Sequence, residues 1–298
     1  MPRSMLTAGL AALLLMQAAM AQDGYKIRIS KKEQVGDRHQ VIEVEKSSEK
    51  TLITDAAGKV QKKQDEVVDK SQTYIESILE KNEGKRPHKL SRNYQKIAFQ
   101  EDGKAVEVPL KGKTVTIERK NGKYSFKLEE GELSDAMLKF LNDSFKYESE
   151  DEERINEALF SAEPVKVGQT WQCDPKGIVK EWLSDMSGNV DASQAIATGK
   201  LLDVYQKEGH PFGKIAVDVS MPVTSIGKGD GAIPAKSGSF FKLKLHIDAC
   251  IDGTQSDGTI DGTMDIFLKA EIPLKEGQKG NLTISVNNKV TETRKPVK

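Results

Sequence analysis

Histidine, cysteine and long apolar runs are all scarce in this sequence. Its four histidines form no H-E-x-x-H helix, and its two cysteines form no C-x-x-C pair. There is no G-x-S-x-G elbow, and the glycine-rich stretch Gly227–Gly231 lacks the G-K-[ST] ending of a phosphate loop. We therefore expect every histidine at the surface or in a turn, and we expect no metal, no cofactor and no catalytic activity.

The one long apolar run of the sequence lies at its N-terminus. The first 21 residues combine a positive Arg3, an apolar run from Leu6 to Met16 and a small-x-small site at Ala19–Ala21. This combination predicts a signal peptide cleaved near Ala21, and hence an exported chain in the periplasm or outside the cell. No later segment approaches the roughly 20 apolar residues of a transmembrane helix, so we expect the mature chain to be soluble.

Charge and cysteine content narrow the classes of protein further. Cleavage of the signal peptide removes one charged residue, Arg3, and leaves 44 basic residues against 45 acidic residues. This balance does not suggest a nucleic acid partner. Cys173 and Cys250 are candidates for a disulfide, because an exported chain meets an oxidising environment. Their positions in the sequence leave open whether the two sulfur atoms come close enough to bond.

Alternating apolar residues dominate the second half of the chain. In 258–272 the even positions from Ile260 are apolar or small, and the odd positions are polar except for Phe267. The same alternation recurs at 200–206, 215–223, 241–251 and 282–290. We therefore predict five consecutive antiparallel strands separated by glycine-containing turns. A sheet with one apolar face must cover it with helices, a second sheet or a ligand.

Several aspartates lie in and beside the third and fourth of these strands. Matching the two apolar faces pairs Ile251 with Ile260 and places Thr254–Asp257 at the tip of a hairpin. Asp261 and Asp265 then point to solvent, about 13 Å apart along the strand, which is too far to share one calcium ion. Turn and strand chemistry therefore explains these aspartates.

The first half is also β-rich but less regular. Tyr25–Ser30 alternates like an edge strand, and Asn121-Gly122 joins two short strands in a hairpin that pairs Ile117 with Phe126. Residues 60–82 fit either a helix or a long strand, and the neighbouring strands favour the strand.

Three amphipathic helices separate the two β-rich parts. They are predicted at Ser134–Phe145, from a capping box at Ser149 and Glu152 to Phe160, and from the N-cap Asp174 to Met186. We place the boundary near the charge-rich stretch Tyr147–Arg154. The chain then divides into a signal peptide (1–21), an N-terminal half (22–147) and a C-terminal half (148–298), and the halves can form one domain.

Two short stretches carry a resemblance to known proteins. EPVKVGQTW and GKTVTIERKNGKYSF are similar to segments of exported bacterial proteins that have no assigned function. In architecture alone, the chain resembles lipid and lipoprotein carriers of the LolA and LppX type. That resemblance implies a curved sheet that wraps helices around an apolar cavity. The chain departs from these carriers in having more residues and no lipobox cysteine.

The sequence therefore predicts an α+β, β-dominated fold in which long, curved antiparallel sheets pack against a few helices, with a pseudo-duplicated arrangement as one option. We expect a non-catalytic binding protein for a lipid, another apolar ligand or an envelope protein. The alternatives are a structural or interaction module with a fully packed core and a secreted hydrolase. The residues expected to line an apolar ligand site are Ile178, Trp182, Met186, Leu243, Leu245, Met264 and Ile266.

Overall fold

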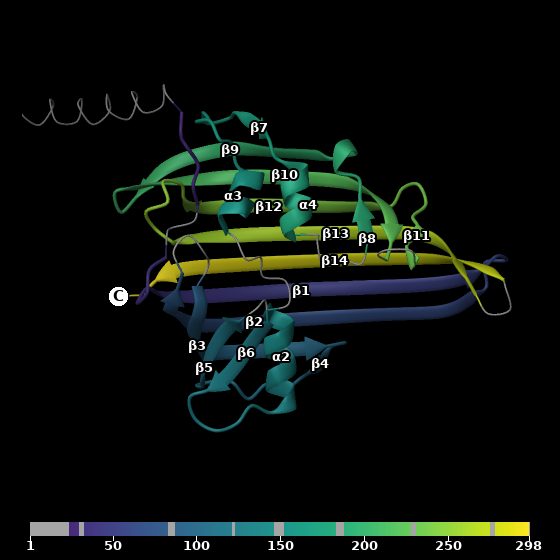
Figure 1. The fold of residues 1–298 in the computed structure, drawn as a ribbon, viewed down its shortest axis with the longest axis horizontal. Helices are drawn as coiled ribbons and strands as arrows, with labels where there is room; N and C mark the ends of the chain where they lie inside the picture. The colour runs from purple at the N-terminus through teal and green to yellow at the C-terminus, as the bar shows by residue number, and fades with distance from the viewer. Residues whose placement is uncertain are drawn as a thin grey trace, which may run out of the picture.

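One large antiparallel sheet dominates the protein (Figure 1). The computed structural model describes residues 24–29, 33–82, 87–120, 123–145, 152–182, 188–227, 231–274 and 278–297. The strands are β1 (Arg38–Asp55), β2 (Val60–Lys81), β3 (Pro87–Glu101), β4 (Lys104–Ala105), β5 (Thr114–Lys120), β6 (Lys123–Leu128), β7 (Thr170–Gln172), β8 (Gly188–Val190), β9 (Ile196–Lys207), β10 (His210–Ile226), β11 (Ile233–Pro234), β12 (Phe240–Cys250), β13 (Gly258–Pro273) and β14 (Lys279–Pro296). The helices are α2 (Asp135–Phe145), α3 (Glu152–Leu159), α4 (Pro175–Trp182) and the short 3₁₀ helix η1 (Ala192–Gln194). The signal peptide expected at residues 1–21 lies outside the described residues.

The last strand joins both ends of the chain into one sheet. The main path runs β6-β5-β3-β2-β1-β14-β13-β12-β10-β9-β7, so β14 lies between β13 and β1. The five consecutive strands predicted for the second half are confirmed as β9, β10, β12, β13 and β14. At 18 residues, β1 and β14 are each about 60 Å long. The fold is thus β-dominated α+β, as the alternating pattern predicts.

The three α-helices within the described residues, α2, α3 and α4, lie on one face of this sheet, which we call the helix-bearing face (Figure 1). Cross-strand partners share a face. One row of partners on this face consists of Val217, Leu245, Gly262, Val290, Glu45 and Lys70. Ile178 of α4 packs in one cluster with Val217, and Ser144 of α2 accepts a hydrogen bond from Lys70.

Two hydrophobic clusters hold the helices at opposite ends of the strand order. The first lies beneath α3 and α4 and includes Trp171, whose indole N–H donates to the carbonyl oxygen of Leu159 at 2.8 Å. A Cβ on Gly199 would lie 2.2 Å from the Trp171 ring, so glycine is required beneath it. The second cluster lies beneath α2, where Phe140 packs edge-on against Tyr94.

Several local predictions are confirmed. Residues 60–82 form the long strand β2, and the Asn-Gly hairpin pairs Ile117 with Phe126 as expected. Asp174 caps α4, because its carboxylate accepts the backbone N–H of Lys176 at 3.0 Å. No helix among the described residues combines the length and apolarity needed to cross a membrane.

The predicted register between β12 and β13 is wrong. The structure pairs Ile260 with Ile247 rather than with Ile251. Both registers bring apolar side chains to the same face, so the alternation alone cannot distinguish them. Ile251 instead lies beyond the end of β12, where its N–H donates to the carbonyl oxygen of Pro211 at 2.9 Å and its side chain fills the first cluster.

Two further predictions need correction. Tyr25 and Arg28 form only isolated bridges, to Val165 and Asp252, so the expected strand over 25–30 is absent from its described part. The alternating pattern of this segment reflects the packing of Ile27, whose side chain enters the first cluster between the two bridges.

Cys173 and Cys250 form no disulfide, and both are buried free thiols. The thiol of Cys173 donates to the carbonyl oxygen of Leu159 at 3.2 Å, whereas that of Cys250 donates to the carboxylate of Asp252 at 3.0 Å. Each sulfur is therefore held in its own surroundings, one after β7 and the other at the end of β12. Burial raises the pKa of Cys173 to about 12, which suppresses its reactive thiolate.

Candidate functional site

The predicted lining residues divide into core residues and a margin. Ile178, Leu243, Leu245 and Ile266 are buried in the first cluster and fill its interior. Met264 is half-buried at the border of that cluster, where the sheet becomes accessible. Trp182 ends α4, but its side chain and all of Met186 lie outside the described residues.

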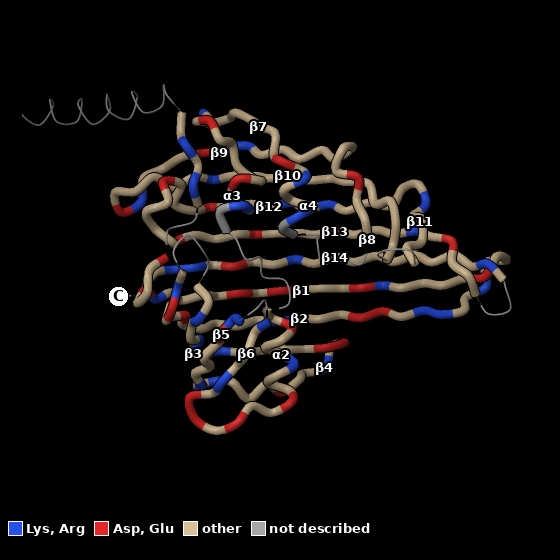
Figure 2. The backbone as a smooth tube through the Cα atoms, viewed as in Figure 1, with Lys and Arg blue, Asp and Glu red and all other residues tan. Residues whose placement is uncertain are grey.

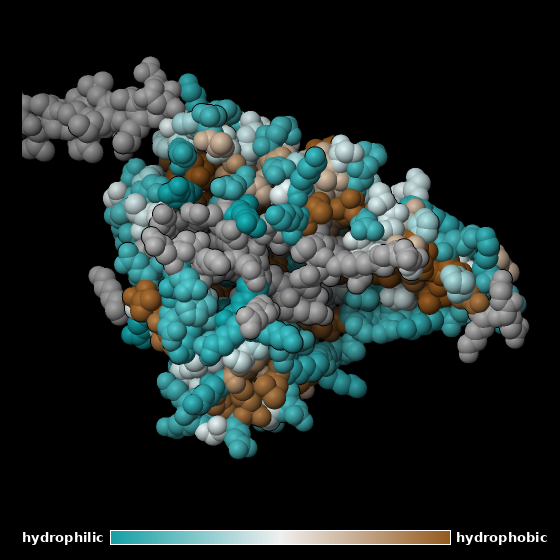
Figure 3. Space-filling model, in the orientation of Figure 1, coloured by the Kyte–Doolittle hydropathy of each residue, from teal (hydrophilic) through white to brown (hydrophobic). Residues whose placement is uncertain are grey.

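From Met264 onward, half-buried apolar side chains continue along the helix-bearing face. We call these residues the apolar band: Ile53, Met264, Leu268, Leu282, Ile284 and Val286. They are neighbours in the sheet, since Leu268 pairs with Ile284, and Leu282 pairs with Ile53. Figure 3 shows hydrophobic side chains at the surface on the right of the view, where β13 ends and β14 begins.

A second group of residues on the same face is polar. We call it the polar band, and it comprises Glu43 and Glu45 of β1, Lys70, Gln72 and Glu76 of β2, Arg92 of β3, and Asn288, Glu292 and Arg294 of β14. It occupies the strands between the two hydrophobic clusters. Charged positions of β14, β1 and β2 accordingly run side by side across the middle of Figure 2.

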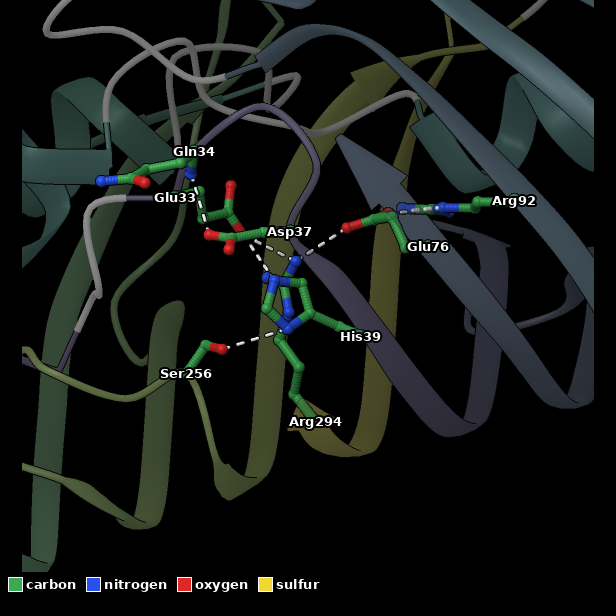
Figure 4. Close-up of polar contacts among 8 residues, drawn as sticks. All are labelled: Glu33, Gln34, Asp37, His39, Glu76, Arg92, Ser256 and Arg294. Atoms are coloured by element: carbon green, nitrogen blue, oxygen red, sulfur yellow. Dashed lines mark hydrogen bonds and ion pairs between the residues drawn. The ribbon is translucent and has the colours of Figure 1, made fainter. Parts of the chain in front are cut away.

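A buried ion cluster forms one end of the polar band (Figure 4). Arg92 donates from Nε to Glu76 Oε2 at 2.8 Å, and these side chains are only 8% exposed. Arg294 Nη2 lies 2.8 Å from Glu76 Oε1 and 2.7 Å from Glu33 Oε1. Burial alone would raise the pKa of Glu76, but the two guanidinium groups outweigh burial and hold this pKa below its ordinary value.

His39 belongs to this ion cluster, so its predicted place at the surface is wrong. The residue is 1% exposed. Its Nδ1 lies 3.1 Å from the hydroxyl of Ser256, and its Nε2 lies 3.9 Å from Glu33. His39 is in phase with the buried Val41 on β1, and this places its ring on the helix-bearing face.

The middle of the polar band is rich in hydrogen-bond acceptors. Gln72, Glu43 and Glu292 lie in register on β2, β1 and β14. Gln72 donates from its amide nitrogen to Glu43 at 2.6 Å, and Lys70 Nζ lies 3.5 Å from the other oxygen of Glu43. Burial raises the pKa of Glu292 and outweighs the opposing effect of Arg294, while Glu43 and Glu76 raise it further.

No sequence motif marks these polar residues. Acidic residues are so abundant that no pair stands out in the sequence. One sequence signal is present: Glu292 and Arg294 occupy the same alternate positions of the strand as the apolar residues Leu282, Ile284 and Val286. Charged residues in the apolar phase of a strand indicate a polar interior or a binding site.

Comparisons with known proteins leave the chain without an assigned family. No family model matches it. No curated protein matches it either. Among solved structures, it is similar to lipovitellin, in a structure titled for its lipid–protein interactions, with 11% identity and a TM-score of 0.36 over 89% of this chain. The chain spans 26% of that lipovitellin chain. Pseudomonas aeruginosa OpdQ shows 9% identity and a TM-score of 0.18, covering 88% of this chain and 98% of its own. Neither TM-score is high enough to assign a fold family.

Proposed function

We propose that this protein is an exported, non-catalytic binding protein that holds a lipid or other apolar ligand against its helix-bearing face. The apolar band carries this proposal. Met264, Leu268 and Val286 pack against the first hydrophobic cluster, and Ile53, Leu282 and Ile284 continue the same face beside them, with all six side chains partly exposed. Full burial of a large apolar side chain is worth roughly 2 kcal/mol, and only a minor part of each side chain is exposed, so a ligand that covers it gains about 0.5 kcal/mol from each.

Among the described residues, the reverse face of the same strands is mostly polar. There, β12, β13 and β14 carry Lys242, Lys244, Asp261, Thr263 and Lys289, with one aromatic pair, Phe240 and Phe267. Of the exposed apolar residues of β1 on this face, Ile42 and Val44 are neighbours, and Lys46, Ser48 and Lys50 separate them from Leu52. Scattered apolar residues are normal on a protein surface, whereas a contiguous band favours binding.

The chemistry of the two bands supports binding rather than catalysis. Glu76 and Glu33 each accept from an arginine, so these two buried carboxylates are engaged in structural contacts. The signal-peptide pattern of residues 1–21 supports export. N-terminal sequencing of the protein from its host should find a chain that begins near Gln22.

Titration with an uncharged fluorescent analogue of a long-chain alcohol tests the binding face. We expect the mature chain to bind the probe, and Ile284→Asp to weaken binding at least tenfold, because a carboxylate would enter the middle of the apolar band. Leu52→Asp is the matched control, since Leu52 lies on the adjacent strand but on the reverse face. Absence of probe binding, or equal loss in both variants with unchanged circular dichroism, would refute the proposal.

A further inference from the structure

The polar band also indicates which headgroup the proposed ligand carries. Along β14, alternate residues on the helix-bearing face change from Leu282, Ile284 and Val286 to Asn288, Val290 and then Glu292. Ile284 and Glu292 are eight residues apart, about 27 Å along an extended strand. One continuous surface therefore passes from apolar to acidic, as recognition of an amphiphile requires.

The positive charges of the polar band are already engaged within the protein. Arg92 bonds Glu76, and Arg294 bonds both Glu76 and Glu33. Lys70 lies beside Glu43, donates to Ser144 at 2.9 Å and sits 5.1 Å from the centre of the Phe140 ring. These contacts direct the three cations towards the sheet and α2, so they offer little to an anionic headgroup.

Acceptors, in contrast, are in excess. Gln72 is 1% exposed, and its amide oxygen has no hydrogen-bond partner among the described residues. The orientation of this amide is set by its nitrogen, which donates to Glu43. Asn288 repeats the arrangement, with its nitrogen donating to Glu45 at 3.2 Å and its oxygen unpartnered within the described part of the chain. A buried acceptor without a donor costs about 1–3 kcal/mol, so both oxygens favour a donor-bearing ligand.

Glu292 completes this acceptor-rich surface. It faces Glu43 directly across the β14–β1 ladder, and like charges in that relation repel. Its side chain is only half-buried, and no ion pair or hydrogen bond engages it within the described ranges. A cation placed between Glu292 and Glu43 would remove the repulsion and stabilise both carboxylates.

We infer that the ligand is an amphiphile with an ammonium headgroup, which binds the Glu292–Glu43 pair and the amide oxygen of Gln72 while its alkyl chain lies along the apolar band. This inference rests on the proposed function. The ammonium group supplies several N–H donors and one positive charge, which match two carboxylates and one unpartnered amide oxygen.

A series of ligands with one alkyl chain and different headgroups tests the inference. Octadecylammonium, octadecanol and octadecanoate are titrated, each below its aggregation concentration, against the mature chain loaded with the uncharged fluorescent probe. An 18-carbon chain is used because Val286, the member of the apolar band nearest to Glu292 in sequence, lies about 20 Å from it along the strand. We expect octadecylammonium to displace the probe at a concentration at least tenfold lower than either other ligand. Glu292→Gln should reduce that preference about tenfold. Asp261→Asn is the matched control, because this aspartate lies on the adjacent strand and the reverse face.

The outcomes separate the two proposals. Equal affinities, or a preference for octadecanoate, would overturn the ammonium headgroup and leave the apolar site standing. A preference for octadecylammonium that Glu292→Gln and Asp261→Asn reduce equally would also overturn it, because non-specific attraction to acidic residues would then be sufficient. If none of the three ligands bound, the proposed function itself would fail, and this inference with it.

Discussion

Replacing Glu76 with glutamine tests whether the buried ion cluster holds the middle of the sheet together. The substitution preserves side-chain volume but removes the carboxylate shared by Arg92 and Arg294, both bonded to it at 2.8 Å. Breaking a buried ion pair by neutralising one partner costs about 3–5 kcal/mol. We expect about 3 kcal/mol, because Arg294 keeps Glu33, and Arg92 keeps its stacking on the rings of Tyr74 and Phe145. For a chain of this size, that corresponds to a fall in melting temperature of roughly 6–12 °C.

The pH dependence of this loss has a defined sign. The folded state lowers the pKa of Glu76 from the reference value of 4.5, so ionised Glu76 stabilises the fold above that pH. The stabilisation disappears as the pH falls through the lower folded value. The parent protein should therefore exceed Glu76→Gln in stability at neutral pH, and the difference should shrink progressively at acidic pH.

Urea denaturation followed by circular dichroism measures the free energy of unfolding of both proteins across this pH range. Glu101→Gln is the control, because Glu101 pairs with Lys139 at an exposed site and should change stability by less than about 0.5 kcal/mol. A Glu76→Gln protein as stable as the parent at neutral pH would refute the reasoning. So would a deficit that stays constant as the pH falls.

Three further predictions concern other parts of the fold. Glu292→Gln should raise stability at neutral pH by about 0.5–1 kcal/mol, because it relieves the repulsion from Glu43. Because the fold raises the pKa of Glu292, this gain is present at high pH and is lost as the pH falls to the pKa that Glu292 has in the unfolded chain. Thermal melts in which Glu292→Gln is less stable than the parent at neutral pH would contradict this prediction. Gly199→Ala should cost at least about 2 kcal/mol in urea unfolding, since its Cβ would overlap the Trp171 ring, whereas Gly231→Ala, with open space around it, should be nearly neutral. Without reductant, a thiol-specific reagent should titrate two thiols per unfolded chain and react slowly with the native protein; a count of zero would establish a disulfide.

The elements of this fold follow from local patterns, but their pairing does so only in part. Period-2 alternation identified β12, β13 and β14, and an Asn-Gly turn of two residues determined one hairpin register because so short a turn admits no other. The longer connection after Cys250 admits several registers that keep apolar side chains on one face. The choice depends on tertiary contacts of Ile251 with Pro211 and the first cluster, which local sequence does not contain.

The polar band could not be recognised for a related reason. Glu33, Glu76 and Arg294 are far apart in sequence, and β14 brings the last of them beside the first strands. Their association depends on sheet order, which strand patterns alone do not specify. The apolar band was partly predictable: Met264 belongs to it, whereas the other described side chains proposed as lining pack inside the first cluster.

Native mass spectrometry of the protein purified from its own host, before and after solvent extraction, tests the central claim most directly. A protein that holds an amphiphile on its helix-bearing face should carry an additional lipid-sized mass that extraction removes, and tandem fragmentation should release an amine-containing ion. A single mass equal to the mature polypeptide in both samples would contradict the claim.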